Sequence, residues 1–354
     1  MHLYIHIPFC SSKCKYCRFS SFVEQEEIKR KYYIEYLKKT IESYKGGIRE
    51  IKTIYFGGGS PSSLTGEYIR EIMFCLEKKF IISKNREITL EVNPKDITQE
   101  KLQFYLSIGI NRFSLGIQSL NFQTLKEIGR DKKKTIFFAL DNFEKLYKKN
   151  ISLDFIIGLP YQKKGQVKKD IQTLLKKYPF IKHISLYMLE DYYYSKSWKK
   201  ISIKEEDFLK EYTQTKNFLE EEGFGRYEIS NFAKKGYKCK HNLAYWNHSD
   251  MIAFGLGAHG YEQGKRYAYP DNFTDYYRGK LQFEEELEEK EKILETIMFS
   301  LRTTGIQKSY FCFLDEKKLD YFFEKGFLEK KKNKIIVSEK GVLVIDFILK
   351  EIIK

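Results

Sequence analysis

Long apolar runs are missing from this sequence of 354 residues. No uninterrupted apolar stretch reaches about 18 residues, the length that marks a membrane-spanning helix, so we expect no transmembrane segment. The first residues also lack the apolar stretch of a secretory signal peptide, and residues 3–7 alternate as a strand does. Both absences predict a cytosolic protein. In that compartment clustered cysteines more often bind metal or do chemistry than form disulfides.

Acidic residues are too few to balance the basic ones, since 63 Lys and Arg face 48 Asp and Glu and leave a net charge of +15. Such an excess suggests nucleic acid or an anionic membrane as a partner. The excess is mostly lysine spread along helix-like segments, and no recognised nucleic-acid module accompanies it. We therefore expect a solvated basic surface and no nucleic-acid partner, and we leave a weak peripheral membrane contact open.

Apolar residues make up 42% of the chain, which excludes a disordered protein and is enough for a large domain plus a smaller one. Short β-rich runs alternate with longer helical patterns. Strands are predicted at 3–7, 52–56, 86–92, 111–117, 151–157 and 181–188, and helices near 24–45, 64–82, 98–108, 134–148, 166–177 and 204–222. Thr65 and Thr98 are candidate helix N-caps. Six strand–helix units in a row predict an α/β fold with a parallel sheet, a partial (β/α)6 barrel over residues 1–223.

The pattern changes after residue 223. Glycines and aromatic residues dominate residues 223–269 without a clear helix, so we predict a barrel extension over residues 224–283. An acidic run at residues 284–286 then leads into a helix that ends near Leu301. Residues 284–354 are predicted to form a small C-terminal helical domain that is winged-helix-like, with a hairpin strand at residues 334–337.

Only six cysteines are present, and three of them fall within eight residues as C-x3-C-x2-C: Cys10, Cys14 and Cys17. They follow the first predicted strand. A fully ligated [4Fe–4S] cluster needs four protein donors, and no fourth Cys lies in this loop, so one iron would stay open for another ligand. A zinc site more often supplies four protein ligands of its own. The other cysteines are isolated, and we expect Cys75 and Cys312 in the core.

The cysteine spacing, with Tyr16 before the last Cys, resembles the signature of the radical-SAM superfamily. The resemblance implies that S-adenosylmethionine chelates the open iron of a [4Fe–4S] cluster. An electron donor for that cluster is then required as a partner. The cysteine loop lies at the carboxyl end of the first strand, where cofactor chemistry sits in such barrels.

Polar groups follow the next strands at the same edge. The glycine loop 57–59 with Ser60 ends the second strand and resembles the loop that holds the methionyl amino group in this superfamily. Glu91 ends the third strand, Gln118 ends the fourth, and Asp154 lies in the fifth. A single carboxylate in a strand is usually a satisfied structural group, whereas polar groups on successive strands indicate a binding rim.

Short sequence motifs across nearly the whole chain resemble those of the coproporphyrinogen-oxidase-like branch of the superfamily. They include residues 4–10, 55–59 and 158–160. The oxygen-independent coproporphyrinogen III oxidases carry a further Cys two residues after the third cluster Cys, where this chain has Phe19. The related haem chaperones called HemW lack it and carry an HNxxYW motif, which stands here at residues 241–246. The resemblance therefore favours the haem chaperones.

The same resemblance implies the contacts to S-adenosylmethionine, which are Tyr4, Gly58, Gly59, Ser60, Glu91, Gln118, Arg130, Asp154 and Met188. Ser60 departs from the Thr that is usual in the family but keeps the hydroxyl. Tyr161 stands where Gly is common, and we have no physical reading of that departure.

His241 is a candidate ligand of haem iron, because imidazole suits that metal, and Tyr245 and Trp246 offer flat apolar faces to a macrocycle. The alternative is a buried histidine that holds its loop to the barrel. Cys239 is a rival ligand, and His248 and His259 could substitute.

The leading hypothesis is a radical-SAM haem chaperone that binds haem and passes it to an acceptor protein, which the sequence does not identify. The alternative is an oxygen-independent coproporphyrinogen III oxidase, which decarboxylates propionates by hydrogen abstraction; Phe19 and the HNxxYW motif argue against it. An RNA-modifying enzyme rests on the basic charge alone. Whether the protein is an enzyme at all stays open at this point.

Overall fold

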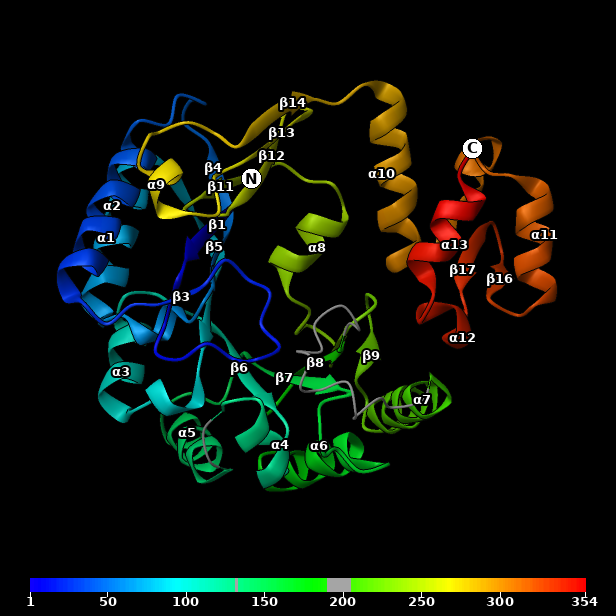
Figure 1. The fold of residues 1–354 in the computed structure, drawn as a ribbon, viewed down its shortest axis with the longest axis horizontal. Helices are drawn as coiled ribbons and strands as arrows, with labels where there is room; N and C mark the ends of the chain where they lie inside the picture. The colour runs from blue at the N-terminus through cyan, green and yellow to red at the C-terminus, as the bar shows by residue number, and fades with distance from the viewer. Residues whose placement is uncertain (131–132, 190–204) are drawn as a thin grey trace.

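A sheet of 12 strands organises the molecule in the computed structural model, which describes residues 1–130, 133–189 and 205–354 (Figure 1). Six of its parallel strands form the barrel predicted from the sequence, and they are β1 (His2–Ile7), β4 (Glu50–Gly58), β5 (Ile81–Val92), β6 (Arg112–Gln118), β7 (Ile151–Ile157) and β8 (His183–Met188). The helices that join or follow them are α1 (Glu27–Glu42), α2 (Gly66–Lys79), α3 (Gln99–Ser107), α5 (Lys133–Leu146), α6 (Gln166–Lys177) and α7 (Glu205–Glu221). They lie along the outside of the curved sheet (Figure 1). The predicted partial (β/α)6 barrel is confirmed.

The two faces of this sheet differ in polarity. Alternate residues such as Leu3, Ile5, Ile54 and Phe56 are fully buried and belong to one large apolar core. The positions between them carry polar side chains, which register in pairs across the strands: His2 with Thr53, Thr89 with Arg112, Asp154 with Ser185. Because side chains alternate along a strand, one set packs on the helices and the other fills the barrel.

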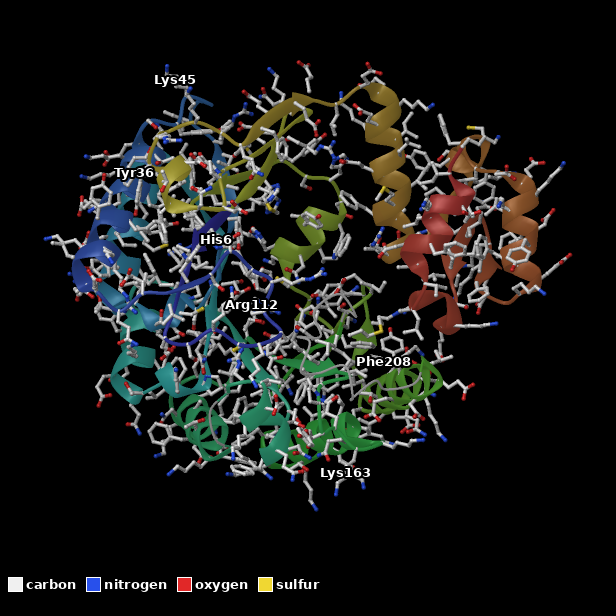
Figure 2. The ribbon with its side chains drawn as sticks, viewed as in Figure 1. His6, Tyr36, Lys45, Arg112, Lys163 and Phe208 are labelled. Atoms are coloured by element: carbon white, nitrogen blue, oxygen red, sulfur yellow. The ribbon has the colours of Figure 1, made fainter. Side chains whose placement is uncertain are left out.

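Figure 2 shows His6 and Arg112 inside the molecule, whereas Lys45 and Lys163 lie at its periphery. Arg112 is 2% exposed, and its guanidinium donates to the side chain of Asn150 at 2.6 Å. A buried arginine needs such partners because an unpaired buried charge is costly. The barrel interior is therefore a polar network.

Residues 223–286 depart most from the prediction. They contain α8 (Lys240–Trp246), where no helix was predicted, and the short helix α9 (Phe273–Tyr276). The strands here are β9 (Gly225–Arg226), β10 (Asn231–Ala233), β11 (Met251–Phe254), β12 (His259–Glu262), β13 (Lys265–Ala268) and β14 (Phe283–Glu286). The acidic run at residues 284–286 is thus a strand, and it pairs with basic residues of β13, with Glu285 opposite Arg266.

Further short elements also escaped the prediction. They are β2 (Phe9–Cys10), β3 (Phe22–Val23), η1 (Pro61–Ser63), η2 (Pro94–Asp96) and α4 (Phe122–Glu127). Residue 204, at the start of the last helix predicted for the barrel, lies outside the described residues. Each missed element is too short to show a periodicity.

The C-terminal elements gather beyond α10 (Glu289–Arg302), as Figure 1 shows. They are β15 (Ile306–Gln307), η5 (Lys308–Phe313), α11 (Glu316–Glu324), β16 (Leu328–Lys331), β17 (Lys334–Val337), α12 (Glu339–Val342) and α13 (Ile345–Ile352). The predicted strand at residues 334–337 forms an antiparallel hairpin with β16. The three domain boundaries stay a prediction. Cys75 is buried as expected, but Cys312 is exposed, so its assignment to the core was wrong.

Candidate functional site

The cysteine loop leaves the barrel after β1 and returns as β3, which pairs in parallel with β2. Its shape is fixed mainly by Lys13, whose ammonium donates to the carbonyls of Phe19 and Ser21, both at 2.9 Å, and to the Ser21 hydroxyl at 2.6 Å. The backbone N–H of Cys17 donates to the carbonyl of Cys14 at 3.1 Å and closes a tight turn. These hydrogen bonds within the loop fix the backbone that carries the three cysteines.

Burial, and next the charge of Cys17, raise the pKa of the Cys10 thiol to about 11. Without a bound metal this thiol keeps its proton at neutral pH, because the effect of burial outweighs the nearby Lys13 ammonium, which lowers the pKa. A bound iron centre would reverse that preference, since metal ligation requires the thiolate.

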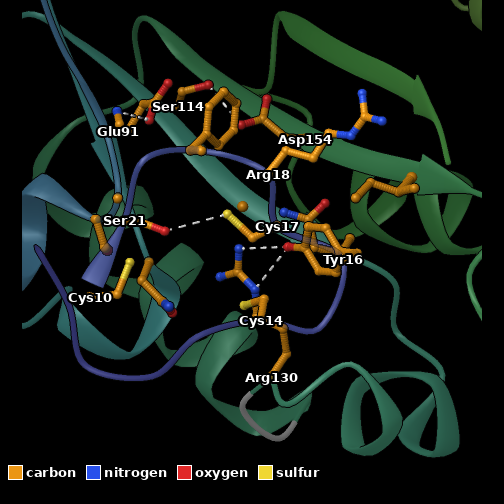
Figure 3. Close-up of a pocket in the computed structure, with 18 of the residues that line it drawn as sticks. Cys10, Cys14, Tyr16, Cys17, Arg18, Ser21, Glu91, Ser114, Arg130 and Asp154 are labelled. Carbon is orange, nitrogen blue, oxygen red and sulfur yellow. Dashed lines mark hydrogen bonds between the residues drawn. The ribbon is translucent and has the colours of Figure 1, made fainter. Parts of the chain in front are cut away.

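Arg130 follows α4 and reaches back to the cysteine loop. Its Nε and Nη2 donate to the hydroxyl of Tyr16 at 3.3 and 3.0 Å, as the dashed lines in Figure 3 show. The loop is also joined to α4 by a hydrogen bond from the Lys15 backbone N–H to the Ile128 carbonyl at 3.3 Å. These contacts place the Arg130 guanidinium beside Cys14 on the floor of a pocket.

Glu91 is held at the opposite wall by two donors. Its carboxylate accepts from the Tyr55 hydroxyl at 2.8 Å and from the Gly58 backbone N–H at 3.2 Å. Burial is the main cause that raises its pKa to about 7, and the charge of Asp154 adds to the effect. At Gly58 the φ angle is +113°, and a Cβ there would lie 2.6 Å from the His6 ring. Only glycine fits this turn, which keeps the backbone open to the pocket.

Gln118 ends β6 at an irregularity in the pairing with β7, and its φ angle is +65°. A bulge of this kind re-aims a side chain, and positive φ in a residue other than Gly is strained. The Gln118 Oε1 atom is buried and has no hydrogen-bond partner within the described part of the chain. A buried acceptor without a donor is costly, so this strained position favours a ligand that donates a hydrogen bond.

The pocket has a volume of about 300 Å³ at the carboxyl ends of the strands. Its lining includes most of the predicted site residues: Cys10, Cys14, Cys17, Gly58, Gly59, Ser60, Glu91, Gln118, Arg130, Asp154 and Met188. Figure 3 shows the cysteines along one side and Glu91, Ser114 and Asp154 along the other. Tyr4 does not line this pocket, because its hydroxyl lies 3.1 Å from His6 Nδ1 inside the barrel.

Other lining residues were not predicted, among them Ser21, Asn93, Ser114, Tyr187 and Leu189. Only Ser114 in β6 and Tyr187 in β8 lie in strands, where they alternate with core residues, and that alternation is the signal that could have found them. Tyr16 was noted only as part of the cysteine signature, although its hydroxyl holds Arg130.

Comparison with known proteins identifies the family. A family model described as the Radical SAM superfamily matches residues 4–174. A haem chaperone HemW from Buchnera aphidicola subsp. Schizaphis graminum is 35% identical, and the match covers 98% of this chain and 97% of the relative. The chain belongs to the HemW family. A HemW from Bacillus subtilis is 32% identical over 96% of both chains.

A solved structure of coproporphyrinogen III oxidase (HemN) from Escherichia coli has the same fold. It superposes with a TM-score of 0.84 and covers 98% of this chain and 88% of that one, at 20% sequence identity. At that identity the likeness shows the fold alone. Phe19 of this HemW-family chain, where a Cys would be expected in an oxidase, is 64% exposed at the pocket mouth.

The pocket fits the cofactors that the superfamily implies, a [4Fe–4S] cluster and S-adenosylmethionine. Three thiols lie on one loop at one end of the pocket. At the other end Gln118, Glu91 and Asp154 offer oxygen acceptors to amino and hydroxyl groups. Within the described ranges, no three His, Cys, Asp or Glu side chains converge closely enough to hold a single metal ion.

The HNxxYW motif of this family lies away from the cysteine pocket. It forms α8, whose first N–H groups are capped by Glu87 of β5: its carboxylate accepts from the backbone N–H groups of Lys240 and His241, both at 3.1 Å. The His241 ring is buried, with Nδ1 2.8 Å from the Thr53 hydroxyl, and burial lowers its pKa to about 3. His241 therefore fills the amino-terminal end of the barrel as a neutral imidazole.

Tyr245 and Trp246 lie at the other end of α8 and meet Phe299 of α10. The ring centroids of Tyr245 and Trp246 are 5.3 and 5.7 Å from that of Phe299. Tyr245 is 51% exposed, so part of this aromatic cluster faces solvent. Within one short helix, His241 is thus buried in the barrel, whereas Tyr245 one turn later faces solvent in part. No helix of the described chain is long and apolar enough to cross a bilayer.

Proposed function

We propose that this protein is a haem chaperone, which binds haem and passes it to an acceptor protein, and that it carries a [4Fe–4S] cluster on Cys10, Cys14 and Cys17. The observation that supports the proposal most is the similarity to proteins named haem chaperone HemW along 98% of the chain. That match includes the cysteine loop and the segment 241–246. When bound, the cluster and S-adenosylmethionine supply one-electron chemistry at the pocket.

The pocket residues would hold and orient S-adenosylmethionine. Gly58 and Gly59 leave the backbone open beside Cys10, where a Cβ on Gly59 would lie 3.0 Å from the Cys10 sulfur. Gln118 and Asp154 are acceptors for amino and hydroxyl hydrogens, and Arg130 offers positive charge beside the cysteine loop. Tyr4 would have an indirect role: its ring stacks on that of Tyr55, whose hydroxyl donates a hydrogen bond to Glu91.

The proposed haem surface is the exposed end of α8, where Tyr245 and Trp246 offer flat faces beside Phe299. We place the iron ligand in the same segment, at His241, whose neutral imidazole suits iron. Its ring would have to leave Thr53 to reach a ligand at the surface. Among the other histidines, His248 is the alternative iron ligand. Its Nε2 lies 2.7 Å from Glu295 Oε2, though the two atoms are not aligned as a hydrogen bond.

Titration of haem into anaerobically reconstituted protein tests this function. We expect a Soret band of defined stoichiometry that weakens or shifts in His241→Ala and stays unchanged in His259→Ala. The same change in His248→Ala alone would move the ligand to His248. Absence of haem binding with the cluster intact would refute the chaperone. Decarboxylation of authentic coproporphyrinogen III in that preparation would then establish the oxidase instead.

The remaining partners are inferred from chemistry. The acceptor protein is unidentified, and an electron donor must approach the cysteine loop. We infer a cytosolic location with peripheral contact to an anionic membrane through the exposed lysines of the β16–β17 hairpin, Lys330, Lys331 and Lys332. Changing all three to Glu should reduce sedimentation with phosphatidylserine vesicles at least several-fold. The matched change of Lys148, Lys149 and Lys176, exposed elsewhere, should not.

A further inference from the structure

A chain of hydrogen bonds runs from the pocket down through the barrel. In the pocket, Asp154 accepts from the Ser114 hydroxyl at 2.8 Å and from the Ser152 hydroxyl at 3.1 Å. The Ser152 oxygen lies 2.7 Å from His183 Nδ1, and His183 Nε2 lies 2.8 Å from the Tyr227 hydroxyl. These inner residues are all buried, so none exchanges its partner for bulk water.

The hydroxyl hydrogens fix the direction of this chain. Ser152 has one hydrogen, and when it donates to Asp154 its oxygen must accept from His183 Nδ1–H and from the hydroxyl of Ser185, which lies 3.1 Å away. Burial lowers the pKa of His183 well below its ordinary value, so the ring is neutral and Nε2 must then accept from Tyr227. The Tyr227 oxygen in turn accepts from the Cys239 backbone N–H at 3.3 Å. Every donor points toward Asp154.

The reverse direction corresponds to a protonated Asp154. A carboxylic acid would donate to Ser152, Ser152 would donate to Nδ1 of His183, and Nε2–H would donate to Tyr227. The proton position on His183 and the charge of Asp154 therefore change together.

Asp154 of β7 interacts with charged or titratable groups of β5, β6 and β8. Burial raises its pKa, the serine hydroxyls and Arg112 of β6 lower it, and its own charge raises the pKa values of Glu91 on β5 and Tyr187 on β8. Arg112 is already satisfied by Asn150. The hydrogen bond from Ser152 is thus the contact to Asp154 whose direction depends on one distant side chain, that of His183.

We propose that His183 and Tyr227 are positioning residues, which hold Asp154 as an ionised acceptor for hydrogen-bond donors of a ligand in the pocket, such as the vicinal hydroxyls of a nucleoside. The proposal rests on the proposed function only in that S-adenosylmethionine is the ligand used to test it. It assigns a role in the pocket to residues that do not line it.

The test measures the affinity of reconstituted protein for S-adenosylmethionine across pH. In His183→Leu we expect binding about tenfold weaker near pH 6 and close to wild type near pH 8.5, because Asp154 now ionises at a higher pH. In His183→Asn the amide nitrogen replaces Nδ1–H, so affinity should recover. Tyr227→Phe should show the His183→Leu pattern more weakly. His2→Leu, which alters a histidine bonded to Thr53 at the same barrel end, should leave the profile unchanged.

An equal loss of affinity at every pH in His183→Leu would show a structural role and overturn the proposal. If the wild type binds no S-adenosylmethionine, the proposed function fails while this inference is still tested by nitrogen-15 spectra of the histidines in ligand-free protein. The proton of His183 should sit on Nδ1 near pH 8.5 and move to Nε2 as the pH falls. A proton on Nε2 throughout contradicts the inference.

Discussion

The carboxyl group of Glu91 is buried in the pocket wall, and its hydrogen-bond donors, the Tyr55 hydroxyl and the Gly58 backbone N–H, are uncharged. Its pKa of about 7 means that it still holds a proton at pH 6, where an unfolded glutamate has lost it. Since the folded state binds more protons between about pH 4.5 and 7, stability falls as the pH rises through that range.

Glu91→Gln should remove this pH dependence. We expect the free energy of unfolding of the wild type to fall relative to the variant by about 3 kcal/mol between pH 4.5 and 7. Urea denaturation of cluster-free protein at several pH values measures the difference. A constant difference across the range would contradict the raised pKa.

Gly58 can be tested against a second glycine of similar conformation. Gly47 has φ +80° with nothing within 4 Å of a Cβ, whereas Gly58 has φ +113° with the His6 ring at 2.6 Å. Gly47→Ala should cost about 1 kcal/mol of strain, and Gly58→Ala at least about 2 kcal/mol more because the ring must move. Chemical denaturation measures both, and equal losses would show that the His6 ring yields freely.

At the residue scale, spacing and strand position pointed to the cysteine loop and to the polar groups at the strand ends, whereas Arg130 and Met188 came from the family resemblance alone; the structure brings the three cysteines and eight further predicted residues into one pocket. Tyr4 and Cys312 show the limit of such reasoning. Tyr4 points into the barrel as His2 and His6 do, but it lies one layer below the pocket, and depth within a barrel leaves no mark on the sequence. Cys312 lies between two aromatic residues in a 3-10 helix, whose three-residue period turned it outward.

At the scale of elements, two predicted N-caps turned out differently. The Thr98 hydroxyl accepts from the Lys101 backbone N–H at 3.2 Å, whereas Thr65 begins α2 without a side-chain cap. Thr98→Ala should therefore destabilise the protein by about 1 kcal/mol and Thr65→Ala by only a few tenths, roughly 0.3 kcal/mol. Thermal unfolding of both variants makes the comparison, and a larger loss in Thr65→Ala would contradict the assigned caps.

The helix α8 escaped sequence analysis for a tertiary reason. It has seven residues, too few for an apolar period, and its first N–H groups are capped by Glu87, 153 positions away in the chain. Isolated helices of this length are unstable in water. The strand β14 escaped because three glutamates in a row have low strand propensity, which pairing with Lys265 and Arg266 outweighs.

At the scale of the molecule, Lys216 of α7 ties the barrel to the C-terminal elements. Its ammonium lies 2.8 Å from Glu220 and 2.7 Å from Glu339 of α12, and its side chain is 13% exposed. Lys216→Met should cost about 1 kcal/mol and lower hydrogen-exchange protection in α12. Lys210→Met, on the exposed face of the same helix, is the control. Unchanged exchange in α12 would show that the two parts are held together elsewhere.

The strand order of the barrel could be predicted because alternating strands and helices allow few topologies. The pairing of β1 with β11 on its other side could not be predicted, because β11 has only four residues and lies almost 250 positions later in the chain. Contacts between residues so far apart leave no local pattern in a single sequence.

That pairing has a consequence for biosynthesis. β1 lies between β4 and β11, so the strand that leads into the cysteine loop gains its second neighbour only after Phe254 has left the ribosome. Such non-local contacts form late and slowly. The nascent chain therefore carries the three cysteines of the proposed cluster site without this second neighbour for most of translation, and we expect the cluster to be inserted only after β11 has emerged.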